Sequence, residues 1–198
     1  MKFTKMHGCG NDYVYVNLFE EKLDDPARVS IYVSDRHFGI GSDGLITIGP
    51  SDKADFRMRI YNADGSEAEM CGNGIRCVAK YVYDHKLTDK TEISVETGAG
   101  IKYLTLYVEE NKVSQVRVDM GEPILTPGDI PVVKADGSAY SDDYRVIDEP
   151  ISAGNREWHM TCVSMGNPHA VVFVDDVAGF EHEKYGPLFA NHKMFPKR

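Results

Sequence analysis

The sequence predicts a mixed fold of the α/β (α+β) class, and three observations support this prediction. Short segments of alternating apolar residues are typical of strands, one longer segment has the apolar spacing of an amphipathic helix, and the composition is globular. Apolar residues make up 42% of the 198 residues and charged residues 27%. A chain of this length can form one large domain or two small ones.

The first third of the chain reads as strands around a short helix. Asp25 followed by Pro26 predicts a helix start, because Asp is a common N-cap and Pro suits the first helical position. Apolar residues then continue at helical spacing to about residue 36. We expect strands over residues 3–6, 13–18, 45–48 and 56–61.

The clearest helix follows Cys71-Gly72-Asn73-Gly74. Apolar residues recur there at i, i+3, i+4, i+7 and i+8, which places them on one face of a helix packed against a core. These residues are Ile75, Val78, Ala79, Val82 and Tyr83. We expect the helix to end near His85-Lys86, because cationic groups suit a helix C-terminus.

The remainder of the chain reads mostly as strands. Residues 91–120 alternate in the manner of paired strands, with a turn at Glu110-Asn111. The segment 121–141 is rich in Gly, Pro and Asp, and we place a domain boundary near its start. Beyond it we expect strands over residues 144–147, 158–164 and 170–174, and a short helix over 181–192.

Charge and hydropathy exclude several classes of function. The net charge of −9, with no basic cluster, argues against binding to the phosphate backbone of a nucleic acid. No apolar run approaches the roughly 18 residues of a membrane span. The N-terminal segment lacks the apolar core of a secretion signal. We therefore expect a cytoplasmic protein whose partner is a small molecule.

The chain has four cysteines: Cys9, Cys71, Cys77 and Cys162. Without a secretion signal, free thiols, metal ligands or catalysis are better explanations for them than disulfides. Cys71 and Cys77 lie six residues apart, and no second cysteine pair completes a zinc site. We expect no metal.

Cys71 is the strongest candidate for chemistry because it directly precedes the clearest helix. A helix N-terminus presents unpaired N–H groups and a partial positive charge, which favour the reactive thiolate form of a cysteine. The flanking Gly72 and Gly74 would let a ligand approach the backbone, whose N–H groups can hold a carboxylate. The alternative is a structural cysteine beside a turn. We expect Cys77, inside the same helix, to be inert packing.

Two asparagines suggest an internal repeat. Asn11 and Asn167 each follow a glycine and precede an alternating strand. If the halves repeat, a second cysteine would lie about 60 residues after Asn167, near position ~227, just as Cys71 lies 60 residues after Asn11. The paired placement makes a shared binding role plausible, although asparagine is also common in turns.

Two further polar residues are weaker candidates. Asn62 ends a predicted strand, where its side chain could contact a polar substrate or cap its own turn. His169 follows Asn167 closely, and a histidine near a thiol could assist proton transfer. A lone histidine is more often structural or exposed.

The segment Gly39-Ile40-Gly41-Ser42-Asp43-Gly44 matches the G-x-G-x-x-G pattern of dinucleotide sites. Such a site needs a strand before the glycines and a helix after them. Here the preceding segment reads as helical and the following one as a strand. We therefore interpret these glycines as part of a turn and expect no nucleotide cofactor.

Five segments together resemble the diaminopimelate epimerases, in the order and spacing of that family. They are residues 5–14, 35–44, 62–66, 71–77 and 164–169. The resemblance implies two similar domains, each with a mostly antiparallel sheet wrapped around a central helix. It assigns residues 1–120 to the first domain, which holds the Cys71 helix, and residues 121–198 to an incomplete second domain.

The resemblance also implies an activity. The family interconverts LL-diaminopimelate and meso-diaminopimelate with two thiols acting as acid and base, without pyridoxal phosphate or another cofactor, in lysine and peptidoglycan precursor synthesis. Matched by motif, Cys71 corresponds to a catalytic cysteine and His169 to an assisting histidine. The positions that correspond to substrate-binding residues are Asn11, Asn62, Gly72, Asn73 and Asn167. The family further suggests a homodimer.

One departure from the family pattern is large. The second cysteine motif has no counterpart in this sequence, and neither Cys9 nor Cys162 lies in a matching segment. We therefore expect the chain to be a fragment that is inactive alone. Two alternatives stay open: a proline-type racemase of the same fold, and a non-catalytic thiol or metal-binding module that uses His7 and the cysteines of the first half.

Overall fold

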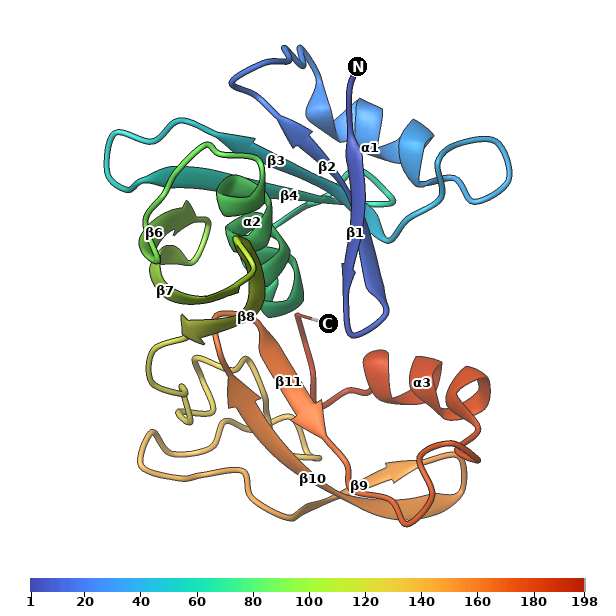
Figure 1. Cartoon of the computed structure of the whole chain (residues 1–198). Helices are drawn as coiled ribbons and strands as arrows, with labels where there is room; N and C mark the ends of the chain where they lie inside the picture. The colour runs from blue at the N-terminus through green and yellow to red at the C-terminus, as the bar shows by residue number, and fades with distance from the viewer. Residues whose placement is uncertain (198) are drawn as a thin grey trace. The chain divides into compact units, whose positions relative to one another are not determined.

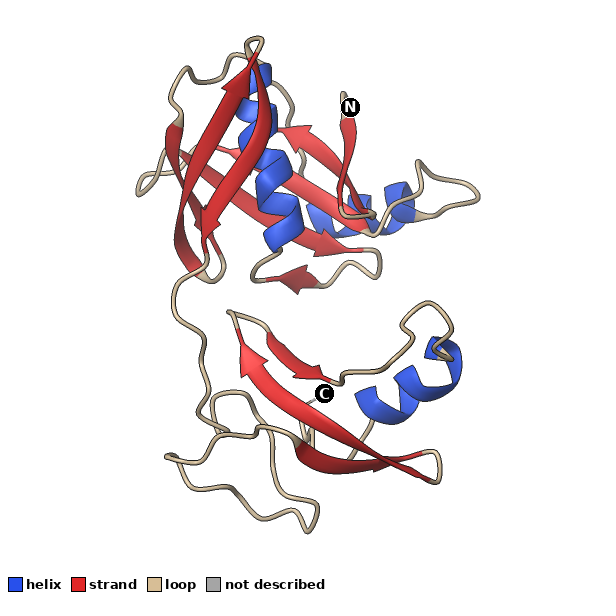
Figure 2. Cartoon of the chain, turned by 60° about the horizontal axis from the view of Figure 1, so that its bottom comes forward, coloured by secondary structure: helices blue, strands red, loops and turns tan. Residues whose placement is uncertain are grey.

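The computed structural model describes residues 1–197, which form two compact units (Figure 1). The first unit is Met1–Met120, and the second begins at Gly121. Strands and helices are mixed in both units, as the sequence predicts (Figure 2). No helix within residues 1–197 is long and apolar enough to cross a membrane.

The first unit opens with a hairpin of β1 (Thr4–Gly8) and β2 (Asn11–Asn17). The two-residue turn between them places Cys9 at φ 55° and Gly10 at φ 84°. Positive φ at both turn residues is the geometry that suits a tight antiparallel hairpin. Gly10 is needed here because few other residues adopt this conformation without strain.

Helix α1 (Pro26–Ser34) begins as predicted, with the Asp25 side chain accepting a hydrogen bond from the Arg28 N–H at 3.0 Å. Three strands follow α1 in the sequence: β3 (Gly44–Gly49), β4 (Phe56–Asn62) and the short β5 (Glu67–Ala68). The sequence analysis did not predict β5. β2 and β3 run parallel, whereas β3 with β4 and β4 with β5 run antiparallel.

Helix α2 (Gly72–Asp84) is the core of the first unit. Four residues of its predicted apolar face, Ile75, Val78, Ala79 and Val82, are fully buried. Its predicted end is confirmed, because His85 follows as the C-cap. Its start is three residues earlier than expected: Gly72, Asn73 and Gly74 form the first turn, since Cys71 itself caps the helix.

The sheet continues with β6 (Glu92–Thr97), β7 (Gly100–Glu109) and β8 (Lys112–Asp119). The predicted turn at Glu110-Asn111 is present, with φ values of 49° and 62°. The strand order is β1-β2-β3-β4-β6-β7-β8, with β5 beside β4. α2 contacts both edge strands, β1 and β8, so the sheet curls around the helix (Figure 1).

Two apolar layers cover the middle of this sheet. On the α2 side, Tyr15, Ile46, Ile60 and other buried residues of the sheet pack against the helix. On the α1 side, Val14, Val16, Leu45 and Tyr61 pack against α1 and its flanking loops. β2 and β3 are therefore buried on both faces, which explains their nearly continuous apolar sequence.

The second unit contains a three-stranded antiparallel sheet, in the order β11-β10-β9, and one helix. The elements are β9 (Glu149–Ala153), β10 (Arg156–Ser164), β11 (Pro168–Val171) and α3 (His182–Ala190). Trp158 is the centre of its core: the ring packs edge-on against Phe180, Tyr185 and Phe189.

Two strand predictions in this unit were wrong. Residues 144–147 are not a strand; the Val146 carbonyl accepts a single hydrogen bond from the Cys162 N–H, and the strand begins only at Glu149. The strand expected over residues 170–174 lies earlier, at Pro168–Val171. In both places apolar residues of an irregular segment fill the core, so their pattern imitates that of a strand.

An ionic cluster ties the β1–β2 hairpin to the loop that precedes β3. The Arg36 guanidinium lies 2.8 Å from Asp12 and 2.9 Å from Asp43, and Lys5 lies 3.0 Å from Asp12. Hydrogen bonding from Arg36 is the main cause that holds the pKa of Asp12 well below its usual range, and Lys5 adds to it. The cluster anchors three segments that are distant in sequence.

Replacing Ile75 by alanine tests the role of α2 as the core. Ile75 is fully buried, so Ile75→Ala should lower the free energy of unfolding by about 2–5 kcal/mol through lost burial and a residual cavity. The matched control is Ile101→Ala in β7, where the side chain is 37% exposed and the loss should stay below about 1 kcal/mol. Equal losses in urea denaturation would contradict a core centred on α2.

Replacing Asp12 by asparagine tests the ionic cluster through its pH dependence. Because the folded pKa of Asp12 is depressed, its stabilising contribution is complete above the unfolded value of about 3.9 and is lost as the pH falls through the folded value. Asp12→Asn should therefore lower Tm at neutral pH, and the difference from the wild type should shrink steadily below about pH 4. A difference that is the same at acidic and neutral pH would show that the charge contributes nothing.

Candidate active site

Three strand ends meet at one edge of the first unit's sheet. Since β2 and β3 are parallel and β4 is antiparallel to β3, the beginnings of β2 and β3 lie beside the end of β4. The register confirms this, because Tyr13 faces Gly44, which in turn faces Asn62. A Cβ atom on Gly44 would lie 2.2 Å from the Tyr61 carbonyl oxygen, so only glycine fits there.

Cys71 lies at the N-terminus of α2 as its cap. Its backbone is extended, with φ −140°, and its sulfur accepts a hydrogen bond from the Gly74 N–H at 3.2 Å. Gly74 has a packing role, because a Cβ atom there would lie 2.6 Å from the Cδ1 atom of Ile46. The first turn of α2 thus packs closely on β3 and holds the thiol at the helix end.

Gly72 and Asn73 leave the helix N-terminus open. Within residues 1–197, neither backbone N–H has a hydrogen-bond partner. A Cβ atom on Gly72 would meet nothing closer than the Met120 methyl carbon at 3.8 Å. Two unpaired donors on an uncrowded backbone, at the positive end of the helix dipole, can bind an anion such as a carboxylate.

Arg76 holds this first turn in place. One guanidinium nitrogen donates to the Gly72 carbonyl at 2.8 Å, and the other donates to the Asn73 side-chain oxygen at 2.6 Å. The second nitrogen also approaches the Cys9 sulfur at 3.9 Å. The side-chain oxygen of Asn73 is therefore occupied by Arg76, and its backbone N–H is available to a ligand.

Asn11 connects the thiol to the sheet. The Cys71 thiol donates to the Asn11 Oδ1 atom at 3.3 Å, and Asn11 Nδ2 donates to Asp43 Oδ2 at 2.8 Å. Residues 60 positions apart in the sequence thus share a hydrogen bond. The sequence predicted Asn11 as a substrate-binding residue; its direct contact with Cys71 was not predicted.

Tyr13 lies one pleat further along β2, on the same face as Asn11. Its ring is buried, and its hydroxyl interacts with the side chains of Asn11 and Cys71. Burial, followed by the proximity of Cys71, raises the pKa of Tyr13 to about 12. The hydroxyl is therefore neutral at physiological pH and forms part of the thiol's surroundings.

Asn62 lies at the same sheet edge, but its side chain is directed to its own turn. Its Nδ2 atom donates to the Ser66 hydroxyl at 3.0 Å, and Asp64 accepts from the Ser66 N–H and hydroxyl. The neighbouring Ala63 N–H donates to the Asp43 carbonyl at 3.1 Å. The contacts of Asn62 in the structure are therefore those of a residue that caps its own turn.

Asn167 and His169 belong to the second unit. The internal repeat suggested by Asn11 and Asn167 is only partial. Asn11 is the first residue of β2, whereas Asn167 lies in the loop between β10 and β11. His169 is an exposed residue of β11 and lines a mostly apolar pocket of about 470 Å³ together with Cys162 and Phe189. Burial raises the pKa of Cys162 to about 11.

The other cysteines differ from Cys71 in their surroundings. Cys77 is buried on α2, as predicted, and burial raises the pKa of its thiol. Cys9 is exposed in the hairpin turn. Within residues 1–197, no three His, Cys, Asp or Glu side chains are grouped so that they could hold a metal ion. The metal-binding alternative required such a group around Cys71 and His7.

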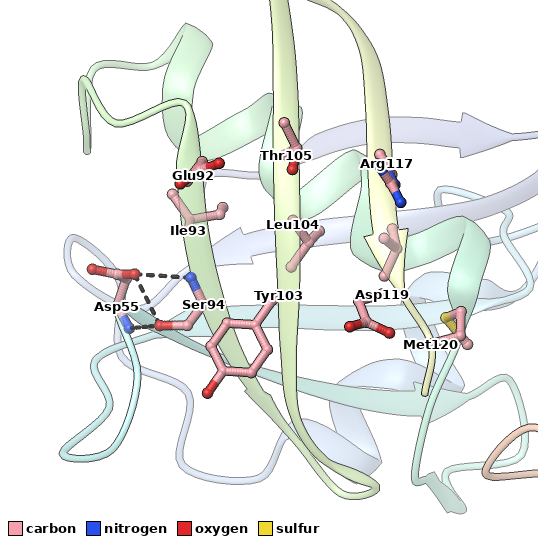
Figure 3. Close-up of a pocket in the computed structure, with 11 residues that line it drawn as sticks. Asp55, Glu92, Ile93, Ser94, Tyr103, Leu104, Thr105, Arg117, Asp119 and Met120 are labelled. Atoms are coloured by element: carbon pink, nitrogen blue, oxygen red, sulfur yellow. Dashed lines mark hydrogen bonds between the residues drawn. The ribbon is translucent and has the colours of Figure 1, made fainter. Parts of the chain in front are cut away.

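A larger pocket of about 620 Å³ lies on β6, β7 and β8, and it contains none of the predicted site residues (Figure 3). Its Asp55 carboxylate is already paired with the Ser94 N–H and hydroxyl, and with Lys90 at 2.5 Å. Hydrogen bonding from Lys90 lowers the pKa of Asp55. The wall holds hydroxyl groups but no cysteine, and its Ser94 hydroxyl is bonded to Asp55. We therefore place the chemistry at Cys71, where a thiol meets open backbone donors.

Sequence reasoning missed three residues of this site: Asp43, Tyr13 and Arg76. Tyr13 could have been predicted from the alternation of β2, because residues 11 and 13 lie on the same face of a strand. Asp43 was passed over as part of a glycine-rich turn. Arg76 lies three and four residues after Asn73 and Gly72, the spacing at which helical residues meet.

Comparison with known proteins identifies one family. The family model for diaminopimelate epimerase matches residues 3–126. A diaminopimelate epimerase of Agathobacter rectalis is 99% identical over the whole chain, which covers 70% of that protein. Diaminopimelate epimerases of Methanococcus maripaludis and Acetivibrio thermocellus are 59% and 58% identical over the whole chain, which covers 69% and 68% of them.

Solved structures share the fold at low identity. A hydroxyproline epimerase from Agrobacterium vitis matches with a TM-score of 0.59 at 14% identity, over 86% of this chain and 50% of that one. A PhzF-family phenazine biosynthesis protein from Bacillus anthracis matches with a TM-score of 0.54 at 20% identity, over 87% and 56%. The chain thus spans about half of each of these structures. The family match and the close relatives together show that this chain belongs to the diaminopimelate epimerase family.

Proposed function

We propose that the protein is an epimerase that interconverts LL-diaminopimelate and meso-diaminopimelate, with Cys71 as one of two acid–base thiols. The observation that carries this proposal is the Cys71 thiol at the N-terminus of α2, next to the two unpaired N–H groups of Gly72 and Asn73. Family membership supplies the substrate, and the local geometry supplies a role for each residue.

In this proposal the backbone of Gly72 and Asn73 holds the α-carboxylate of the substrate. Removing the α-proton moves negative charge toward this carboxylate, because no cofactor is present in the proposal to accept the electron pair. Preorganised N–H donors at a helix N-terminus stabilise such charge. Arg76 keeps the donors in position by fixing the Gly72 carbonyl and the Asn73 side chain.

Inversion requires one group to remove the proton from one face of the α-carbon and another to deliver a proton to the opposite face. Cys71 is suited to one of these roles because it is partly accessible and accepts the Gly74 N–H bond. Cys77 and Cys162 are buried with raised pKa values, and Cys9 lies in an exposed turn. We therefore propose that the second thiol comes from the part of the family's polypeptide that these 198 residues do not cover.

The remaining predicted residues have separate roles in this proposal. Asn62 and Asn167 would contact the distal amino-acid group, and His169 would assist proton transfer. Asn62, which is half-buried at the end of β4, would have to turn from Ser66 toward the substrate. Asn11 keeps one Nδ2 hydrogen and one Oδ1 lone pair for the substrate beyond its bonds to Asp43 and Cys71.

A proline-type racemase is the second candidate, because a hydroxyproline epimerase shares the fold. The family match and the relatives at 58–59% identity favour diaminopimelate. We further propose, from the family resemblance alone, that the enzyme acts in lysine and peptidoglycan precursor synthesis, in the cytoplasm and as a homodimer.

The proposed function is tested by measuring epimerisation with the longer Agathobacter rectalis relative, substituted at the position of Cys71. Chiral chromatography would follow LL-diaminopimelate and, separately, L-proline. We expect turnover of diaminopimelate alone. We also expect a loss of at least about 10³-fold in kcat for Cys71→Ser, because a serine hydroxyl is a much weaker acid than a thiol and its alkoxide is not populated at neutral pH.

The matched control is Cys9→Ser, which removes a thiol of the same unit outside the proposed chemistry and should leave kcat within about two-fold, as surface substitutions usually do. Near-normal turnover in Cys71→Ser would exclude Cys71 as an acid–base group. Turnover of proline in place of diaminopimelate would favour the racemase.

A further inference from the structure

The orientation of the Asn11 amide is determined by Asp43. An ionised carboxylate only accepts hydrogen bonds, so the Asn11 atom that lies 2.8 Å from Asp43 Oδ2 must be the donor, Nδ2. The amide oxygen, Oδ1, therefore faces the Cys71 sulfur at 3.3 Å. This assignment follows from the chemistry of the partners and requires no view of hydrogen atoms.

Asp43 is itself firmly held. Its second carboxylate oxygen accepts from Arg36 at 2.9 Å, and the oxygen that binds Asn11 also accepts from the Asp12 N–H at 3.0 Å. Its backbone N–H donates to the Asp12 carbonyl at 2.8 Å, and its carbonyl accepts from Ala63 at 3.1 Å. Neither the Asp43 carboxylate nor the Asp43 backbone can rotate without breaking several of these hydrogen bonds.

The two partners of Cys71 favour different protonation states. The Gly74 N–H donates to the sulfur and stabilises the thiolate. The Asn11 oxygen can only accept, so it stabilises the protonated thiol and would repel a thiolate. Because Asp43 holds the Asn11 amide in this orientation, the Asn11 oxygen faces the Cys71 sulfur and favours the protonated form of the thiol.

We propose that Asp43 is a positioning residue which, through the Asn11 amide, keeps Cys71 as the protonated thiol of the resting enzyme and thus as the proton donor in the direction of the reaction that starts from this state. This inference rests on the proposed function, in which Cys71 exchanges a proton with the α-carbon. In the step it assigns, the Cys71 S–H bond breaks and a C–H bond forms on the carbanion left by the other thiolate. The electron pair stays on the Cys71 sulfur, where the Gly74 N–H stabilises it.

The ionisable groups next to Cys71 are neutral at pH 7, so they do not obscure a measurement of the protonation state of Cys71. Tyr13 and Tyr15 on β2 and Cys77 on α2 are ionisable and interact with Cys71, and burial is the first cause that raises the pKa of each. All three are therefore neutral at pH 7. The charged groups behind Asn11 are Asp43, Arg36, Asp12 and Lys5, and Arg76 is the charged group of the first turn of α2. Changes in Cys71 reactivity on substitution of Asp43 can then be assigned to Asn11 and Asp43.

The test is the rate at which iodoacetamide alkylates Cys71 in this chain, in a Cys9→Ser background that removes the exposed competing thiol. Only the thiolate reacts, so the rate at about pH 7 divided by the rate at about pH 9 reports the thiolate fraction, whereas accessibility changes both rates equally. Peptide mass spectrometry assigns the modified cysteine, and circular dichroism confirms that each variant is folded.

Asp43→Ala frees the Asn11 amide to turn its Nδ2 toward the sulfur. We expect the rate ratio to rise about five-fold, the effect of one hydrogen bond of ordinary strength.

Asn11→Ala should also raise the rate ratio, because the hydrogen-bond acceptor of the Cys71 thiol is lost. The double variant should match Asn11→Ala alone, since Asp43 acts only through Asn11. The matched control is Asp35→Ala, which removes a carboxylate of the same loop that accepts the His37 and Phe38 N–H groups and should leave the ratio unchanged.

An unchanged ratio in Asp43→Ala, or effects of the two substitutions that add in the double variant, would overturn the proposal. Equal acceleration at both pH values would show loosened packing and would overturn it as well. Because alkylation requires no turnover, this outcome is independent of the epimerase assay, and failure of one leaves the other interpretable.

Discussion

The hydrogen bond from the Gly74 N–H to the Cys71 sulfur is the constraint on which the site depends. It makes the thiol the cap of α2, so the helix that forms the core also fixes the reactive atom. The sheet curls around this helix, and its strand order brings Asn11 and Asp43 to the helix N-terminus. Fold and site therefore share one element, and a shift of α2 would disturb both.

Much of the fold was predictable because local patterns and tertiary packing agree. The apolar face of α2, the Asp25 cap of α1 and the turn at Glu110-Asn111 follow from periodicity and turn chemistry. The second unit was harder: residues 144–147 fill the core from an irregular segment, and β5 has only two residues. The apolar pattern of residues 144–147 imitates that of a strand, and two residues are too few for an alternating pattern to reveal β5.

The site was predictable at its centre and obscure at its edges. Cys71, Gly72 and Asn73 form a contiguous motif at a helix start, so their proximity is a local property. Tyr13 reaches Cys71, and Asp43 reaches it through Asn11, only because β2 and β3 run parallel and begin at the same edge of the sheet. Asn62 shows the reverse case, since its position was foreseen but its present contacts serve its own turn. Long-range register therefore decides which polar residues near a motif belong to the site.

The central claim is that the Cys71 sulfur carries the proton exchanged at the α-carbon. The most direct measurement is NMR of LL-diaminopimelate incubated in heavy water with the longer Agathobacter rectalis relative and its Cys71→Ala variant. The account predicts that the wild type yields inverted product with solvent deuterium at the α-carbon, and that the variant yields none. Deuterated, inverted product formed by the variant at the wild-type rate would contradict the account.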